Sequence, residues 1–187
     1  MFQHIKELEI PGVLLIQPRI FTDPRGSFVE IWNAAREANG GFAPRFVQDN
    51  VAFSKHAVLR GLHFQHPHAQ GKYVTAVYGE IYDVAVDLRP ESATFGDWIS
   101  VELSAANGSA VYIPPGFAHG YQVLSAEAVV LYKCTDYYHA DCDRGIAWND
   151  PQLAITWPID QPVLSEKDQR APTFDVVCRE LGLRASV

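Results

Sequence analysis

The sequence predicts an all-β protein, a β-sandwich or closed barrel with a few short helices. Runs rich in β-branched and aromatic residues recur along the chain, separated by turn residues. Helix signals are confined to 33–38 and to 165–170, where Ser165 is suited to cap the N-terminus. Because a closed or double sheet leaves few bare strand edges, a jelly-roll barrel is favoured. The predicted strands cover residues 12–21, 27–32, 46–53, 58–64, 73–78, 81–88, 98–103, 110–113, 119–124 and 129–137.

Turn residues indicate how neighbouring strands pair. Asp23-Pro24-Arg25-Gly26 joins the first two runs into a hairpin, and Gly79 and Asn107-Gly108 mark two further turns. Within 81–88, apolar side chains alternate with a more polar set, so one face is expected to meet a core and the other a polar environment. The two sets are Val84, Val86 and Leu88 against Asp83, Ala85 and Asp87.

Length and charge narrow the class of protein. The chain has 187 residues, 48% hydrophobic and 20% charged, which predicts one folded domain over 1–187. A net charge of −7 disfavours nucleic acid or an anionic membrane as a partner. A local group of Arg and Lys side chains is still able to bind a small anionic ligand.

Cysteine usage and the first residues indicate the compartment. Cys134, Cys142 and Cys178 are too few and too scattered for a disulfide framework or a zinc site, so reduced thiols are expected. Segment 1–11 mixes charged and apolar residues without a continuous apolar run, which predicts neither a signal peptide nor a membrane span. We therefore expect a cytoplasmic protein.

Several histidines follow the spacing of a metal site. In the small β-barrels called cupins, metal ligands come from a His-x-His pair, a following Glu and a later His. Here His66, His68 and His119 occupy the histidine positions, but Lys72 stands in place of the Glu. An ammonium group has no lone pair to offer a metal. A metal-dependent cupin using these three histidines remains the alternative, and the sequence favours a site without metal.

His63 is the better candidate for chemistry. A neutral imidazole with a pKa of about 6.5 accepts a proton near neutral pH, and a carboxylate usually orients it. Asp49, Asp83 and Asp168 are all candidates for that carboxylate from sequence alone. Arg60 and Lys72 are suited to hold an enolate oxygen or a phosphate.

Tyrosines offer an acid and a stacking surface. Tyr132 lies in an apolar run, where it is either a core residue or a phenol that returns a proton to a carbanion. Tyr137 and Tyr138 are suited to stack on an aromatic ligand or to pack at a strand end.

These motifs together resemble one family, the dTDP-4-dehydrorhamnose 3,5-epimerases, which are metal-independent enzymes with a cupin fold. The resemblance covers residues 12 to 170, and an ordered series of this length is specific where each motif alone is weak. It rests on 23–26 with Phe28 and Glu30, Gln48-Asp49-Asn50, Arg60 to Gln65, Gln70-Gly71-Lys72, 83–89, 94–98, 113–119, Tyr132-Lys133-Cys134 and Trp148-Asn149-Asp150-Pro151.

The resemblance implies a role for each matching position. His63 resembles the base, Asp168 its carboxylate partner, Tyr132 the acid on the opposite face of the sugar, and Lys72 the cation that stabilises the enolate. His119 is similar to a residue of the sugar pocket. Thymine is expected to stack on Phe28 or Tyr138, and the nucleotide-sugar is expected to contact Arg25, Glu30, Gln48, Asn50, Arg60, Asp143 and Lys167.

The resemblance also implies the reaction and the assembly. The expected substrate is dTDP-4-dehydro-6-deoxy-D-glucose, inverted at C3 and C5 through an enolate to give dTDP-4-dehydro-L-rhamnose, with no cofactor. The alternatives are inversion of C3 only and a barrel that binds a sugar nucleotide without catalysis. A homodimer is implied, with N-terminal strands exchanged between subunits. Asp143 departs from the family, which usually has Glu there.

Overall fold

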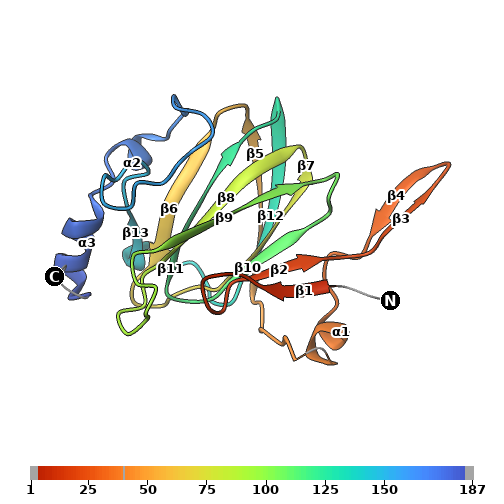
Figure 1. Ribbon diagram of the computed structural model, residues 1–187, viewed down its shortest axis with the longest axis horizontal. Coiled ribbons are helices and arrows are strands. Elements are labelled where there is room, and N and C mark those ends of the chain that lie inside the picture. Colours follow the sequence, from red (N-terminus) through yellow and green to blue (C-terminus); the bar gives the residue numbers. More distant parts are fainter. Residues whose placement is uncertain (1–3, 40, 184–187) are drawn as a thin grey trace.

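The computed structural model, which describes residues 4–39 and 41–183, confirms the predicted all-β fold. Two antiparallel sheets face one another, and the C-terminal helices lie at the outer side of one of them (Figure 1). The apolar interior between the sheets includes Val74, Val111, Tyr121 and Val130, which are all buried. The predicted domain 1–187 also includes residues 1–3, 40 and 184–187, which lie outside the described residues.

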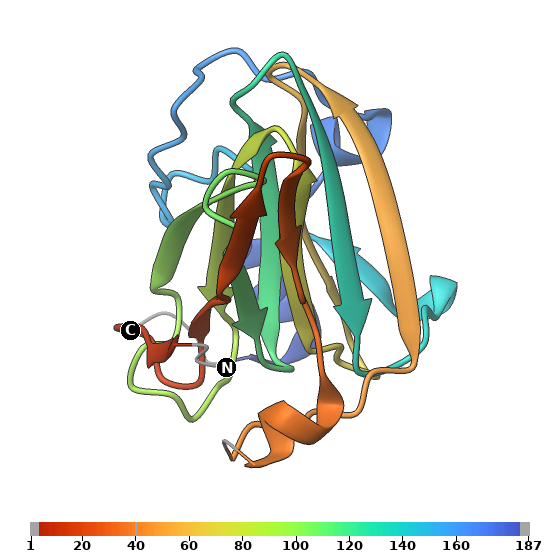
Figure 2. The same cartoon turned by 90° about the vertical axis from the view of Figure 1, so that its right-hand side faces the viewer.

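The larger sheet has six strands. Their order is β1 (His4–Glu7), β2 (Leu14–Gln17), β10 (Ala110–Ile113), β7 (Lys72–Tyr78), β12 (Glu127–Cys134) and β5 (Gln48–Lys55). Figure 2 shows β5 and β12 side by side, and their register pairs Asn50 with Tyr132. Side chains opposite each other in a sheet share one face, so these two point the same way.

The smaller sheet has five strands and carries the predicted base His63 and the predicted binding residue His119. Their order is β13 (Asp143–Gly145), β6 (Leu59–Gln65), β11 (Phe117–Val123), β8 (Glu80–Asp87) and β9 (Trp98–Ser104). His63 of β6 and His119 of β11 are register partners. The two imidazoles are therefore brought together by strand pairing alone.

A separate hairpin projects from the body of the molecule (Figure 1). It consists of β3 (Ile20–Asp23) and β4 (Gly26–Val29), joined at the turn that the sequence predicts. The run expected at 12–21 instead divides into β2 and β3. Pro18 lies between them, and a proline lacks the N–H that a continuous ladder would need.

Helices are short and mostly cover the smaller sheet. Two predicted helices are present as α1 (Ala34–Asn39) and α2 (Glu166–Gln169), beside a single turn, η1 (Ala140–Cys142). Ser165 caps α2 by accepting a hydrogen bond from the Asp168 amide. Helix α3 (Phe174–Leu181) was not predicted from the sequence. It buries Phe174 and Val177 against the outer face of the smaller sheet. Among described residues, no helix has the length and apolar character to cross a membrane.

The alternation predicted for β8 is present, with one difference. Val84 and Val86 face the outer cluster under α3, whereas Ala85 belongs to the interior cluster between the sheets. Asp83, on the same face as Ala85, is 1% exposed. The more polar face of β8 therefore lines the inside of the barrel rather than meeting solvent.

Candidate active site

A cavity of about 280 Å³ opens between the two sheets and collects most of the predicted site residues. His63 reaches it from β6 of the smaller sheet, and Tyr132 and Lys72 reach it from β12 and β7 of the larger one. An imidazole and a phenol therefore enter one space from opposite walls. The other lining residues are Gln48, Asn50, Phe64, Gln65, Gln70, Cys134, Tyr138, Asp143 and Lys167.

His63 is oriented by a carboxylate from the C-terminal segment. Its Nε2 lies 2.6 Å from Oδ1 of Asp168, which is 5% exposed. The Ser165 hydroxyl donates to Oδ2 of Asp168 at 2.8 Å. Burial acts to raise the pKa of Asp168, but the hydrogen bonds from His63 and Ser165 hold that pKa below its usual value. Asp168 is therefore an anion, and Nδ1 of His63 is the ring nitrogen left to accept a substrate proton.

A second histidine–aspartate pair lies beside the first. His119 Nε2 is 2.8 Å from Oδ2 of Asp83, and both residues are buried. Burial lowers the pKa of His119 even though Asp83 opposes the shift, and the neighbouring Lys72 lowers it further. His119 is therefore expected to be a neutral, fixed polar group next to His63.

Lys72 is one of two lysines that line the cavity, beside Lys167 of the rim. It begins β7, and its Nζ lies 3.5 Å from the carbonyl oxygen of His63. Burial lowers the pKa of Lys72, while Cys134, Asp83 and Asp143 act to raise it. A partly buried ammonium beside a base is placed to stabilise negative charge that develops on a bound oxygen.

Tyr132 has the protonation state that an acid needs. It is half-buried in β12, and burial raises the pKa of its phenol. The hydroxyl therefore stays protonated near neutral pH and is able to donate. The neighbouring Cys134 thiol lies 3.6 Å from Nδ2 of Asn50, and burial raises its pKa as well.

The rim of the cavity is a connected polar network. The Tyr138 hydroxyl donates to Oδ2 of Asp143 at 3.0 Å, and Lys167 donates to the same oxygen. The Tyr138 amide donates to Oε1 of Gln48 at 2.9 Å. The predicted binding residues Gln48, Asn50, Tyr138, Asp143 and Lys167 thus lie together, and the shorter Asp143 still bridges a tyrosine and a lysine.

Five predicted binding residues are not among those that line this cavity, and one of them is the buried His119. Arg60 is exposed at the start of β6, where its Nε donates to the Ser54 hydroxyl at 3.0 Å. Glu30 follows the β3–β4 hairpin and accepts a hydrogen bond from Asn33. Arg25 and Phe28 lie on the hairpin itself, where the Arg25 side chain is 90% exposed and Phe28 is 67% exposed.

The structure distinguishes the alternatives that the sequence left open. Of the three candidate carboxylates, Asp168 orients His63, Asp83 orients His119, and Asp49 pairs with Lys133. The histidines considered for a cupin metal site do not converge. His119 is buried in the barrel, whereas His66 and His68 lie on the exposed loop after β6.

Sequence reasoning assigned no role to several residues that line the cavity: Phe64, Gln65, Gln70 and Cys134. Gln65 and Gln70 lie in motifs that carried the resemblance, so the sequence indicated that they belong near the site. It did not indicate what they do, because an amide side chain carries no charge and does not titrate. Gln65 joins the loops on either side of the cavity through the carbonyl groups of His68 and Tyr137.

Comparisons with known proteins show the family of this chain. Residues 7–175 match the sequence model of the family described as dTDP-4-dehydrorhamnose 3,5-epimerase. The chain belongs to this family. It is 52% identical over 169 residues to the Pseudomonas aeruginosa dTDP-4-dehydrorhamnose 3,5-epimerase, covering 89% of this chain and 93% of that protein. The predicted family and the predicted isomerase class are confirmed.

Solved structures extend the comparison to bound ligands. The Legionella pneumophila dTDP-6-deoxy-D-glucose-3,5-epimerase, in complex with dTDP-4-keto-L-rhamnose, has a TM-score of 0.92 and 46% identity, with both chains fully covered. A 3'-monoepimerase from Streptomyces bikiniensis, in complex with dTDP-quinovose, has a TM-score of 0.86 and 35% identity, covering 96% of this chain and 91% of that one. This epimerase family thus includes both double and single inversion on one fold.

Proposed function

We propose that this protein inverts C3 and C5 of dTDP-4-dehydro-6-deoxy-D-glucose to give dTDP-4-dehydro-L-rhamnose. One observation carries the proposal: a carboxylate-paired imidazole and a protonated phenol enter the same cavity from opposite sheets. Inversion of a carbon requires removal of its proton on one face and delivery of a proton on the other. Family membership identifies the sugar nucleotide.

The first step is proton removal next to the C4 ketone. Nδ1 of His63 takes the proton from C3 or C5, and the C–H electrons form an enolate with the C4 oxygen. Asp168 stabilises the imidazolium through Nε2. Lys72 is placed to stabilise the enolate oxygen, so negative charge develops beside a fixed cation.

The second step is proton delivery to the opposite face. Tyr132 donates its phenolic proton to the carbon, the C=C electrons form the new C–H bond, and the ketone is restored. Burial raises the pKa of Tyr132, so the phenol is protonated when the enolate forms. Because His63 and Tyr132 are fixed on separate strands, the sugar ring has to turn for both carbons to react in one site.

The nucleotide is proposed to occupy the rim. Tyr138 is 56% exposed and presents a ring face for thymine, and Lys167 supplies a cation for the diphosphate. Incubation with the 4-keto sugar nucleotide in heavy water, followed by NMR, tests the reaction. Deuterium at both C3 and C5 is expected. Exchange at C3 alone would assign the protein to the single-inversion enzymes, and exchange at neither carbon would leave only a binding function.

We propose further that the protein acts as a homodimer in the cytoplasm. Support comes from the projecting hairpin. Its Phe28 is 67% exposed and lines a cavity that the hairpin residues themselves form. The outer face of the larger sheet also exposes Val51, Phe53 and Val77, at 52%, 73% and 45%. Large exposed apolar side chains that cluster on one face mark a protein interface. In this arrangement Arg25 and Phe28 complete the nucleotide site of the other subunit.

Mixing of inactive variants tests the shared site. Arg25→Ala and His63→Ala are each expected to be nearly inactive. If Arg25 acts across the interface, a mixture refolded one to one regains about a quarter of wild-type activity, because half of the dimers are mixed and each has one intact site. A mixture that remains inactive, while light scattering shows a dimer, would place Arg25 in its own subunit's site.

A further inference from the structure

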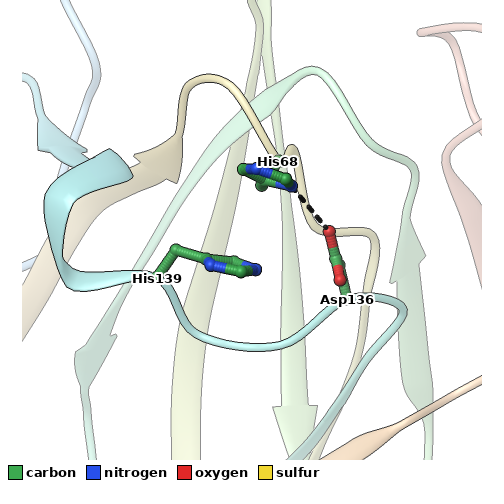
Figure 3. A group of neighbouring side chains, drawn as sticks. All are labelled: His68, Asp136 and His139. Carbon is green, nitrogen blue, oxygen red and sulfur yellow. Dashed lines mark ion pairs between the residues drawn. The ribbon is translucent and has the colours of Figure 1, made fainter.

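A cluster of two histidines and an aspartate lies at the rim of the cavity, outside the proposed catalytic set (Figure 3). His68 comes from the loop after β6, and Asp136 and His139 come from the segment after β12. The two imidazole rings are stacked, with centroids 4.3 Å apart and planes 21° from parallel. Nδ1 of His68 lies 3.6 Å from Oδ2 of Asp136.

The donor set matches a borderline transition metal. One ligand atom from each of the three residues lies within 4.8 Å of the others, and no other group of three His, Cys, Asp or Glu side chains in 4–39 and 41–183 is as close. Imidazole nitrogen and carboxylate oxygen are the ligands that Zn²⁺ takes in open sites. We propose that His68, Asp136 and His139 bind one divalent transition-metal ion, with Zn²⁺ as the best fit.

Binding requires a small rearrangement that the surroundings allow. Zinc–ligand bonds of about 2.0–2.2 Å place ligand atoms about 3.5 Å apart, so the three must approach by about 1 Å. Parallel rings also cannot both aim their in-plane lone pairs at one ion, so one ring must tilt. The side chains of His68 and Asp136 are 51% and 37% exposed, which leaves both side chains room to turn.

The backbones that carry the ligands are already joined. Nε2 of Gln65 donates to the carbonyl oxygen of His68 at 2.8 Å, and Oε1 of Gln65 accepts from the His139 amide at 2.7 Å. Gln65 is 5% exposed, so these bonds are sheltered from water. Gln65 already holds the main chains of His68 and His139 together, and the ion would join their side chains as well. Because the two loops are held in place before the ion binds, binding costs little loop-closure entropy.

The site has a consequence for the cavity. Tyr138 lies between Asp136 and His139 in the chain and lines the cavity. An ion held by Asp136 and His139 would restrict the motion of the segment that carries Tyr138. Any effect of that restriction on nucleotide affinity rests on the proposed function, whereas metal binding itself does not.

Calorimetric titration of the untagged protein with ZnCl₂ at pH 7.5, without substrate, tests the site. One Zn²⁺ per chain is expected to bind, and His68→Ala and His139→Ala are each expected to weaken it at least about tenfold. His66→Ala is the matched control, because His66 is an exposed histidine of the same loop outside the cluster. It is expected to bind zinc as the wild type does.

Hydrogen exchange distinguishes this site from adventitious surface binding. Zinc is expected to slow amide exchange in 66–70 and 135–139 of the wild type, but not of His139→Ala. The proposal is wrong if the wild type shows no saturable binding of one ion. It is equally wrong if His68→Ala and His139→Ala bind zinc with wild-type affinity. Neither result depends on epimerase activity, so failure here leaves the proposed function untouched.

Discussion

The two histidine–aspartate pairs of the barrel are register neighbours with different surroundings. His63–Asp168 and His119–Asp83 have nitrogen–oxygen distances of 2.6 and 2.8 Å. The His63 side chain is 32% exposed and lines the cavity, whereas that of His119 is 8% exposed. The hydrogen bond is the same, so access to the cavity is what separates them.

This difference assigns different chemistry to similar pairs. An imidazole at a cavity wall is able to take a proton from a ligand and return it to water. A buried imidazole whose pKa is lowered by burial stays neutral and acts as a fixed dipole. The carboxylates also differ in origin, because Asp83 lies in β8 whereas Asp168 comes from α2 in the C-terminal segment.

Replacing the base of the more exposed pair is the most direct test of this difference between the two pairs. His63→Ala is expected to lower kcat by about 10³-fold, because general base catalysis typically contributes 10²–10⁴-fold. Affinity for dTDP, measured by calorimetry, is expected to stay within about twofold, since the imidazole is proposed to act on the sugar rather than on the nucleotide. A loss of kcat under about tenfold would show that another group removes the proton.

Lys72 interacts with both pairs, because its Nζ lies 3.5 Å from the carbonyl oxygen of His63 and its charge adds to burial in lowering the pKa of His119. Its replacement tests whether that charge serves catalysis. Lys72→Ala is expected to lower kcat by about 10²–10³-fold, the usual cost of a lost oxyanion stabiliser. A smaller loss in dTDP affinity is expected. Steady-state kinetics and calorimetry give the two numbers. Equal losses in kcat and in affinity would make Lys72 a binding residue only.

Matched carboxylate variants sharpen the contrast between the pairs. Asp168→Asn removes the anion that stabilises the His63 imidazolium, and kcat is expected to fall by about 10²-fold. Asp83→Asn changes a buried pair away from the cavity wall, and a fall of less than about tenfold is expected. Both variants keep side-chain volume. Equal losses in kcat would show that His119 shares the proton transfer.

Much of this arrangement could be predicted from the chain, for identifiable reasons. Asp23-Pro24-Arg25-Gly26 predicts the β3–β4 turn, and Ser165 predicts the N-terminal cap of α2. Lys72 in place of a metal-binding Glu indicated a site built around a cation. These signals are local, so a single stretch of sequence contains them.

Features that depend on distant segments could not be predicted from the residues alone. The residues alone left three candidate carboxylates for His63, and the resemblance selected Asp168. The packing of α2 on β6 places that carboxylate against His63. Helix α3 was missed although its apolar positions follow a helical period, because a segment of only eight residues is not stable as a helix without the sheet that it covers. The His68–His139 stack joins two loops 71 positions apart, which no local pattern records.

The smallest expected effect is on stability rather than catalysis, and it isolates the buried pair. Because the folded pKa of His119 is lowered, the unfolded chain binds a proton below about pH 6.5 that the folded protein excludes. The free energy of unfolding therefore falls as pH drops from 7.5 to 5.5, by at most about 1.4 kcal/mol per pH unit for this one group.

His119→Gln removes that titration while keeping a donor for Asp83. Its free energy of unfolding, from urea titrations, is expected to fall less steeply with decreasing pH than that of the wild type. His56→Gln, at an exposed histidine, is the matched control for the His-to-Gln substitution itself. A His119→Gln profile as steep as the wild type would show that the buried imidazole titrates alike in the folded and unfolded states. The two pairs would then differ in access alone.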